Sequence, residues 1–209
     1  MTARYVFAAL ILLGVAALAP TARAQTWTEV GDAGDLIATA QTTVGAGAIT
    51  QITGSLPLSD DVDLYCVRLT SVPPAGTPLV QLVCVAQQSP NVWLFDAAGN
   101  GVFTNETCAL GSKTLLAPSV SMTPGTYYVG VSYYNRNAIS AGGNIWIPGV
   151  PGQRTPDGPG AAQPLSGWAG IVVMNPPNPY TINLTGFAAC AAPTPTLPGT
   201  WGRVKTYYR

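Results

Sequence analysis

The alternation of side chains in residues 126–134 limits the fold of this chain more than any other feature. In this segment, TYYVGVSYY, the odd-numbered positions bring Tyr127, Val129, Val131 and Tyr133 to one face. A side-chain period of two indicates a β-strand with one face in a core, because a helix repeats about every 3.6 residues. Similar short apolar and β-branched runs, each bounded by turn formers, occupy residues 49–56, 62–69, 79–85, 92–95 and 180–187. About seven or eight short strands without a long amphipathic helical pattern predict an all-β fold, an antiparallel β-sandwich.

The connections between these strands are of two kinds. Residues 96–101 (DAAGNG) predict a hairpin turn at Asp96 and Asn100, because glycine and asparagine accept the positive φ angles of tight turns. Residues 135–179 are dense in Gly, Pro and Asn and too long for an ordinary connection, so we expect one long Gly/Pro-rich loop that is either functional or poorly ordered. Its Trp146 and Trp168 are expected to pack against the sandwich.

The two ends of the chain predict export and a separate tail. Arg4, an apolar run and the small-residue site at Ala24 are typical of a secretory signal peptide at 1–24. The run of about 14 residues is shorter than the roughly 20 that span a bilayer. We therefore expect a secreted domain at 25–190, extracellular or at the cell surface, without a transmembrane segment after cleavage. A Pro/Thr linker at 191–200 and an aromatic, basic C-terminal tail at 201–209 (Trp201 to Arg209) follow it.

The charged residues exclude several classes of function. There are 9 Lys and Arg against 9 Asp and Glu, with no histidine. Loss of Arg4 and Arg23 with the signal peptide leaves a mild acidic excess, so the basic surface that binds nucleic acid is missing. Catalysis by Ser-His-Asp or Cys-His groups is excluded because no imidazole is available. A pair of carboxylates, as in glycoside hydrolases, remains possible from the sequence.

All four cysteines lie in the part predicted to be exported, where disulfides form. Two bridges are the simplest expectation, and three pairings of Cys66, Cys84, Cys108 and Cys190 are open. The competing structural zinc site is disfavoured because the chain has no CxxC pair and no histidine.

Acidic residues gather in two short stretches of the sequence. They are Glu29, Asp32 and Asp35 in the first stretch and Asp60, Asp61 and Asp63 in the second. Oxygen ligands gathered at turns are what Ca²⁺ requires, which makes Asp32, Asp35, Asp61 and Asp63 candidate metal ligands. The alternative is that these aspartates stabilise turns and that Asp63 faces solvent on its strand.

The order of several motifs resembles the bacterial pre-peptidase C-terminal (PPC) domain over about residues 27–187. After the acidic opening come ITGSL (52–56), DVDLY (61–65), WLFDAAGN (93–100) and PGTYYVGV (124–131). The resemblance implies a jelly-roll-like β-sandwich on a secreted protein, which is not itself catalytic. Some members of the family bind Ca²⁺ and polymers such as collagen, so it implies calcium between Asp32, Asp35 and Asp61, Asp63.

Three hypotheses about function follow. The first is a secreted, non-catalytic module that binds or stabilises at the cell exterior, with Ca²⁺ as its candidate cofactor and an extracellular polymer or protein as its partner. The second is a carboxylate-based hydrolase that acts on glycans. The third is a structural cell-surface protein whose tail, 201–209, docks to a sorting or surface partner.

Overall fold

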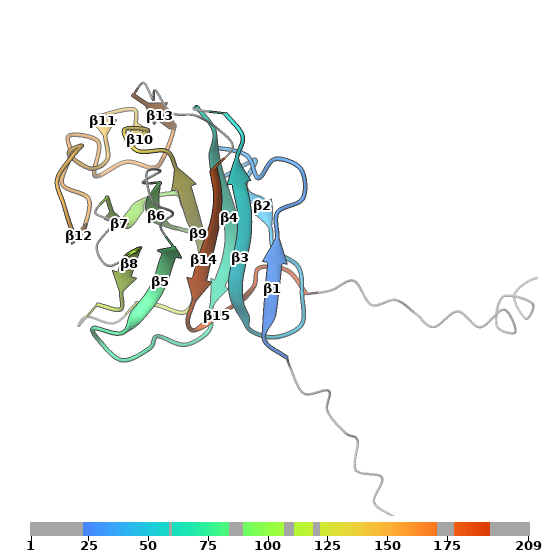
Figure 1. Ribbon diagram of the computed structural model, residues 1–209. Coiled ribbons are helices and arrows are strands. Elements are labelled where there is room, and N and C mark those ends of the chain that lie inside the picture. Colours follow the sequence, from blue (N-terminus) through green and yellow to red (C-terminus); the bar gives the residue numbers. More distant parts are fainter. Residues whose placement is uncertain are drawn as a thin grey trace, which may run out of the picture.

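The fold is a sandwich of two β-sheets (Figure 1) in a computed structural model that describes residues 23–58, 60–83, 90–106, 111–118, 122–170 and 178–192. The first sheet has five strands in the order β1 (Gln25–Thr28), β3 (Ile49–Leu56), β14 (Asn178–Leu184), β5 (Pro78–Val83) and β8 (Ser112–Leu116). The second has seven: β12 (Gln153–Arg154), β7 (Gly101–Asn105), β6 (Asn91–Asp96), β9 (Gly125–Ser132), β4 (Val62–Leu69) and β15 (Phe187–Ala189), with β2 (Gln41–Thr42) beside β4. One apolar cluster joins the facing sides of both sheets. The predicted all-β sandwich is confirmed.

Consecutive strands from β3 to β6 alternate between the two sheets, as in a jelly-roll-like winding. The ladders are antiparallel except for β1 with β3 and β2 with β4, which are parallel. The runs at 49–56 and 62–69 form β3 and β4 with the bounds expected from sequence. The turn after β6 is also confirmed, because Gly99 has a φ of 85° and donates to the Asp96 carbonyl at 3.0 Å.

The run at 180–187, predicted as one closing strand, divides into β14 and β15 in opposite sheets. The division falls at Gly186, whose φ of 82° turns the chain out of an extended path. The Gly186 carbonyl accepts hydrogen bonds from the amides of Thr70 and Ser71, which join this turn to the end of β4. Alternation alone does not reveal such a change of sheet, because the side-chain pattern continues across it.

The long segment predicted as a loop contains short strands. Within its described residues, β10 (Asn137–Ser140) pairs with β11 (Gly143–Asn144) and with β13 (Gly167–Ala169), while β12 extends the second sheet. Figure 1 shows this small sheet beside one end of the sandwich. The prediction of a plain loop is therefore wrong for residues 135–170, and residues 171–177 lie outside the described part.

A second apolar cluster holds this segment in place. Trp146 and Trp168 are buried against Trp93 of β6, with ring centroids 5.3 and 5.7 Å from it. The prediction that both tryptophans pack against the sandwich is confirmed. The outward side of the second sheet is thus covered too, so β6 and β9 have apolar contacts on both faces.

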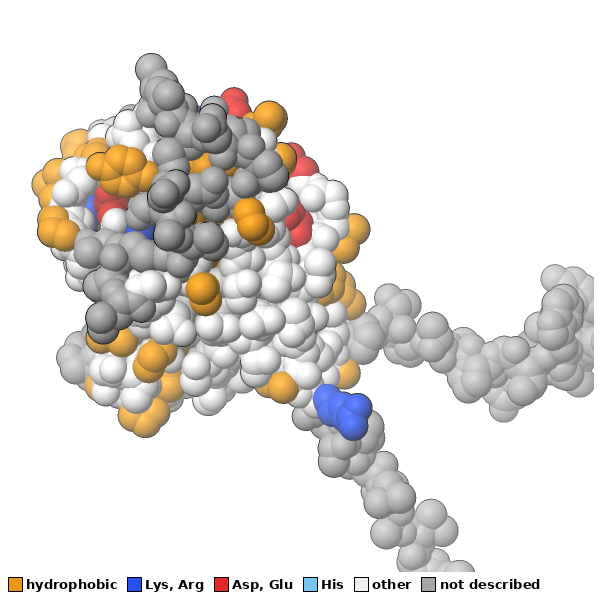
Figure 2. Space-filling model, in the orientation of Figure 1, with side chains coloured by type: hydrophobic (Ala, Val, Ile, Leu, Met, Phe, Trp, Pro, Cys, Tyr) orange, Lys and Arg blue, Asp and Glu red, His pale blue; other side chains and the backbone are white. Residues whose placement is uncertain are grey.

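The ends of the chain lie largely outside the described residues. The predicted signal peptide at 1–24 is described only at its last two positions, and the linker at 191–200 only at Ala191 and Ala192. The tail at 201–209 is not described. No helix in the described part is long and apolar enough to cross a membrane. Figure 2 shows a face on which charged side chains are few and uncharged surface dominates.

Candidate metal centre

Three aspartates from the two acidic stretches come together at one end of the sandwich. One carboxylate oxygen each from Asp32, Asp61 and Asp63 lies within 4.8 Å of the others. Asp32 comes from the segment after β1, Asp61 directly precedes β4, and Asp63 is the second residue of β4. Carboxylate oxygens at this separation can contact a single cation.

Backbone hydrogen bonds bring the first stretch to the second. The Leu64 amide donates to the Gly34 carbonyl at 3.0 Å, and the Gln41 amide donates to the Ala33 carbonyl at 2.9 Å. Asp32 Oδ1 accepts the Gly34 amide at 2.8 Å, which closes a local turn around the carboxylate. The segment between β1 and β2 is therefore attached to β4 beside its acidic end.

Asp63 is fully buried. The alternative interpretation of the sequence, in which the Asp63 side chain faces solvent, is therefore wrong. Asp63 Oδ2 accepts a hydrogen bond of 2.5 Å from the Tyr180 hydroxyl, which also lies 2.5 Å from the Tyr65 hydroxyl. Asp63 Oδ1 has no hydrogen-bond partner among the described residues. A buried carboxylate oxygen without a donor costs free energy unless a proton or a ligand reaches it.

The cluster holds more negative charge than its surroundings neutralise. Burial raises the pKa of Asp63 to about 8, partly opposed by the Tyr180 hydrogen bond and increased by the charges of Glu29 and Asp61. Burial and the charge of Asp32 raise the pKa of Asp61 to about 6. Carboxylates that raise each other's pKa in this way favour a proton or a metal ion between them.

Glu29 is a fourth acidic group at this site, although it is not among the four predicted ligands. Glu29 Oε2 accepts the Ser55 amide at 2.9 Å, and burial raises the pKa of this carboxyl. Gly54 permits the approach, because a Cβ there would lie 2.7 Å from Glu29 Oε2 and would collide with the Tyr180 hydroxyl. The signal in the sequence is the position of Glu29 three residues before Asp32.

The fourth predicted ligand, Asp35, does not join the group. Its side chain is exposed, and its backbone carbonyl accepts a hydrogen bond of 2.6 Å from Trp168 Nε1. The backbone at Asp35 therefore helps to hold Trp168 of the small sheet, whereas its carboxylate takes no part in this contact. Asp60 is exposed and is also absent from the group.

The set of donor atoms suits a hard cation. The groups are carboxylates, and a cavity of about 120 Å³ lies beside them, lined by Glu29, Asp32 and Asp61 among other residues. Asp63 Oδ1 supplies a buried oxygen that lacks a partner among the described residues. The residues present thus fit a Ca²⁺ ion, which binds six to eight oxygens from carboxylates, carbonyls and water.

A disulfide lies elsewhere on the same strand. Cys66 of β4 is bonded to Cys190, which follows β15, across 124 positions of sequence. This is one of the pairs that the sequence left open. The other two predicted disulfide cysteines, Cys84 and Cys108, lie outside the described residues.

Comparison with known families and curated proteins does not assign a function to the chain. No family model matches it, and no curated protein matches it. The function must therefore be inferred from the site itself.

Proposed function

We propose that this chain is a secreted, non-catalytic β-sandwich module that binds Ca²⁺ and is stabilised by it at the cell exterior. The ligands in this proposal are Asp32, Asp61 and Asp63, with Glu29 beside them. The observation that carries it is the buried carboxylate of Asp63, whose Oδ1 has no donor among the described residues. One oxygen of this carboxylate lies within 4.8 Å of oxygens of Asp32 and Asp61. The resemblance to PPC domains and the Cys66–Cys190 disulfide support a setting outside the cell.

Calcium would act here as a cross-link between segments. Asp32 belongs to the segment after β1, whereas Asp61 and Asp63 lie at or just before the start of β4. One ion would therefore join two parts of the chain that are otherwise held by a few hydrogen bonds. Binding to the folded chain at a hundredfold excess over Kd adds about 2.7 kcal/mol of stability. We expect an extracellular polymer or protein as the partner of the stabilised module.

Titration calorimetry of the purified exported chain with Ca²⁺, together with thermal melts, tests this proposal. We expect heat of binding and a rise in Tm of about 5–10 °C at a hundredfold excess of Ca²⁺ over Kd. Asp63→Asn is expected to weaken binding at least about tenfold, or about 1.4 kcal/mol. This variant stays folded, because the asparagine oxygen can still accept from Tyr180.

Asp35→Asn is the matched control, since Asp35 is a nearby aspartate of the same acidic stretch that lies outside the cluster. It is expected to bind Ca²⁺ like the unmodified chain. Absence of heat and an unchanged Tm with the unmodified chain would end the calcium proposal. Equal loss in both variants would show that general negative charge, and not the cluster, attracts the ion.

The glycan hydrolase hypothesis finds less support in this geometry. The cavity of about 120 Å³ beside the acidic cluster is smaller than the roughly 300 Å³ at which ligand pockets begin. Asp63 has no exposed surface through which it could reach a sugar. Turnover of a glycan panel that is lost in Asp61→Asn would restore the hypothesis.

A further inference from the structure

A lysine and an asparagine are buried against each other where the two sheets meet, in a place unrelated to the acidic cluster. Lys113 lies on β8 of the first sheet, Asn91 begins β6 of the second, and neither has exposed surface. Lys113 Nζ donates a hydrogen bond of 2.7 Å to Asn91 Oδ1. Since a lysine nitrogen only donates, this contact assigns the oxygen and nitrogen of the carboxamide.

The two groups have the reactivity of a nucleophile and a carbonyl. Burial lowers the pKa of Lys113 to about 8, although the charge of Glu106 opposes this change. A part of the amine is therefore neutral near pH 7.5 and can act as a nucleophile. Its position next to Asn91 Oδ1 places it beside the carboxamide carbon.

We propose that Lys113 and Asn91 condense into an intramolecular isopeptide bond that covalently joins the two sheets. Lys113 Nζ attacks Asn91 Cγ, the bond from Cγ to Nδ2 breaks, and Nδ2 leaves as ammonia. The proton that Nζ gives up is transferred to the leaving nitrogen. No oxidant or reductant is consumed, because one amide replaces another.

The condensation removes two unfavourable features of the unreacted pair. Asn91 Nδ2 is buried without a hydrogen-bond acceptor among the described residues, and it departs as ammonia. The buried ammonium of Lys113 becomes part of a neutral amide. A buried charge and an unsatisfied buried donor each cost free energy, so their loss favours the cross-linked state.

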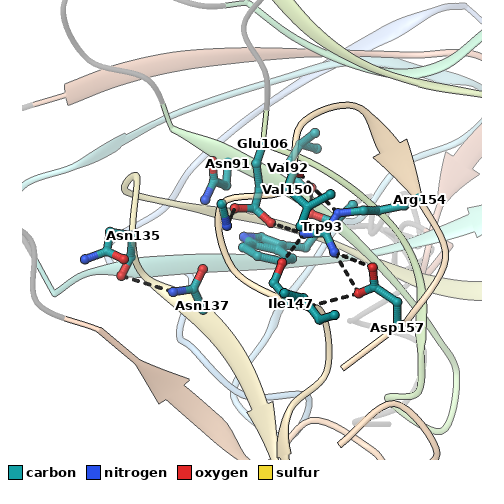
Figure 3. A network of polar contacts seen from close by, with 12 residues as sticks. Asn91, Val92, Trp93, Glu106, Asn135, Asn137, Ile147, Val150, Arg154 and Asp157 are labelled. Carbon is teal, nitrogen blue, oxygen red and sulfur yellow. Dashed lines mark hydrogen bonds and ion pairs between the residues drawn. The ribbon is translucent and has the colours of Figure 1, made fainter. Parts of the chain in front are cut away.

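Glu106 is the carboxylate that carries the proton in this proposal. The negative charge of Glu106 favours the protonated form of Lys113 and so raises its pKa. The side chain of Glu106 is itself almost fully buried. Arg154 pairs with one of its oxygens, and the Gly149 amide donates to the other at 3.0 Å. Figure 3 shows Arg154 between Glu106 and Asp157, which it also binds, so several contacts hold Glu106 in position.

Mass spectrometry of the folded exported chain tests the bond. We expect the intact chain to be lighter by one ammonia than the same chain isolated in denaturant before folding. Digestion is expected to give a branched peptide that joins the segment with Asn91 to the segment with Lys113, with no tryptic cleavage at Lys113. Two separate, unmodified peptides and complete cleavage at Lys113 would overturn the proposal.

Lys113→Met is the control for the mass, because it retains the N-terminus and lacks the amine. An N-terminal glutamine also loses ammonia when it cyclises, and that loss would appear in both chains. The branched peptide must disappear completely in this variant, whether or not it folds. If the ammonia loss persists there in full, it comes from another residue, and the isopeptide assignment fails.

The variants Glu106→Gln and Asp157→Asn distinguish the role of Glu106 in proton transfer from the structural role of the ion pairs with Arg154. Both variants weaken the contacts of Arg154, but only the first removes the carboxylate that acts on Lys113. We expect cross-linking during refolding to slow at least about tenfold in Glu106→Gln, and to proceed normally in Asp157→Asn. Equal rates in the two variants would overturn the role of Glu106.

Discussion

Asp63 combines full burial with a carboxylate oxygen that has no hydrogen-bond donor within the described residues. Tyr180 satisfies only the other oxygen. The burial follows from the strand itself, because Asp63 shares a face of β4 with Tyr65 and Val67, which lie in the core between the sheets. An aspartate in this position must be protonated or must neutralise its charge with a cation.

The raised pKa values in this cluster determine how the folding stability of the metal-free chain depends on pH. The pKa values of about 8 for Asp63 and about 6 for Asp61 lie above those of an unfolded chain, so the folded state binds more protons between about pH 4 and pH 8. The stabilising contribution of protonation is complete below about pH 4 and is lost as pH rises through this window. In the presence of a chelator, Tm is expected to fall from about pH 5 to about pH 7.5.

Thermal melts with a chelator and with saturating Ca²⁺ check this pH dependence. Because the ion replaces bound protons, Ca²⁺ is expected to raise Tm more at about pH 7.5 than at about pH 5. Asp63→Asn removes the group with the higher pKa and should flatten the profile in chelator. A Tm in chelator that rises over this range in the unmodified chain would contradict the expected sign.

At the scale of elements, the turn between β14 and β15 decides to which sheet each strand belongs. Gly186 has a φ of 82°, and a Cβ at this position would collide with the Ser71 carbonyl oxygen. The same turn accepts two backbone hydrogen bonds from the end of β4. The positive φ and the lack of space for a Cβ both require glycine at position 186.

Gly186→Ala is expected to destabilise the chain more than Gly76→Ala. Gly76 has a similar φ of 79° but open space around its Cβ position, so alanine there costs about 1 kcal/mol from backbone strain alone. At Gly186 the collision adds to the strain, and we expect a total loss of about 3 kcal/mol or more. Denaturant unfolding measures both values, and equal losses would show that the Ser71 carbonyl simply moves aside.

The strands show how far the side-chain pattern predicts structure. Alternation places Tyr127, Val129 and Val131 of β9 on one face, and the structure puts these residues in the core between the sheets. The other face of β9 is also buried, at Gly130 and Ser132, because residues from 137 to 169 cover it. A period of two identifies a strand and its faces, but it does not show what packs on either face.

At the scale of the whole molecule, the Cys66–Cys190 disulfide connects β4 to the end of the described chain. Its loop of 124 positions is long, and long loops lose the most entropy when they are closed in the unfolded state. The double variant Cys66→Ser/Cys190→Ser is therefore expected to lose about 2–5 kcal/mol of unfolding free energy.

Denaturant unfolding of this double variant measures the loss, and hydrogen exchange locates it. Faster exchange is expected first in β15, which lies beside β4 at the end of the strand order in its sheet. The unmodified chain in its oxidised state is the reference. Unchanged stability would mean that β15 stays paired with β4 without the disulfide.

The sequence by itself determined the class of fold, the positions of most strands and the hairpin turn at Gly99. These follow from local rules, since alternation and turn-forming residues act within a few positions of the chain. It also showed that acidic residues gather in two stretches, and two of the three aspartates that meet belong to DVDLY. The residue types thus identified candidate ligands, but they contained no information on the distances between them.

Only the tertiary structure decided which of these residues meet. It excluded Asp35, added Glu29, and placed Tyr180 on Asp63 across 117 positions of sequence. It also brought Lys113 to Asn91 from another sheet, a contact with no signal in the sequence. The physical reason is that strand periodicity fixes the face on which a side chain lies, whereas the packing of two sheets fixes its partner.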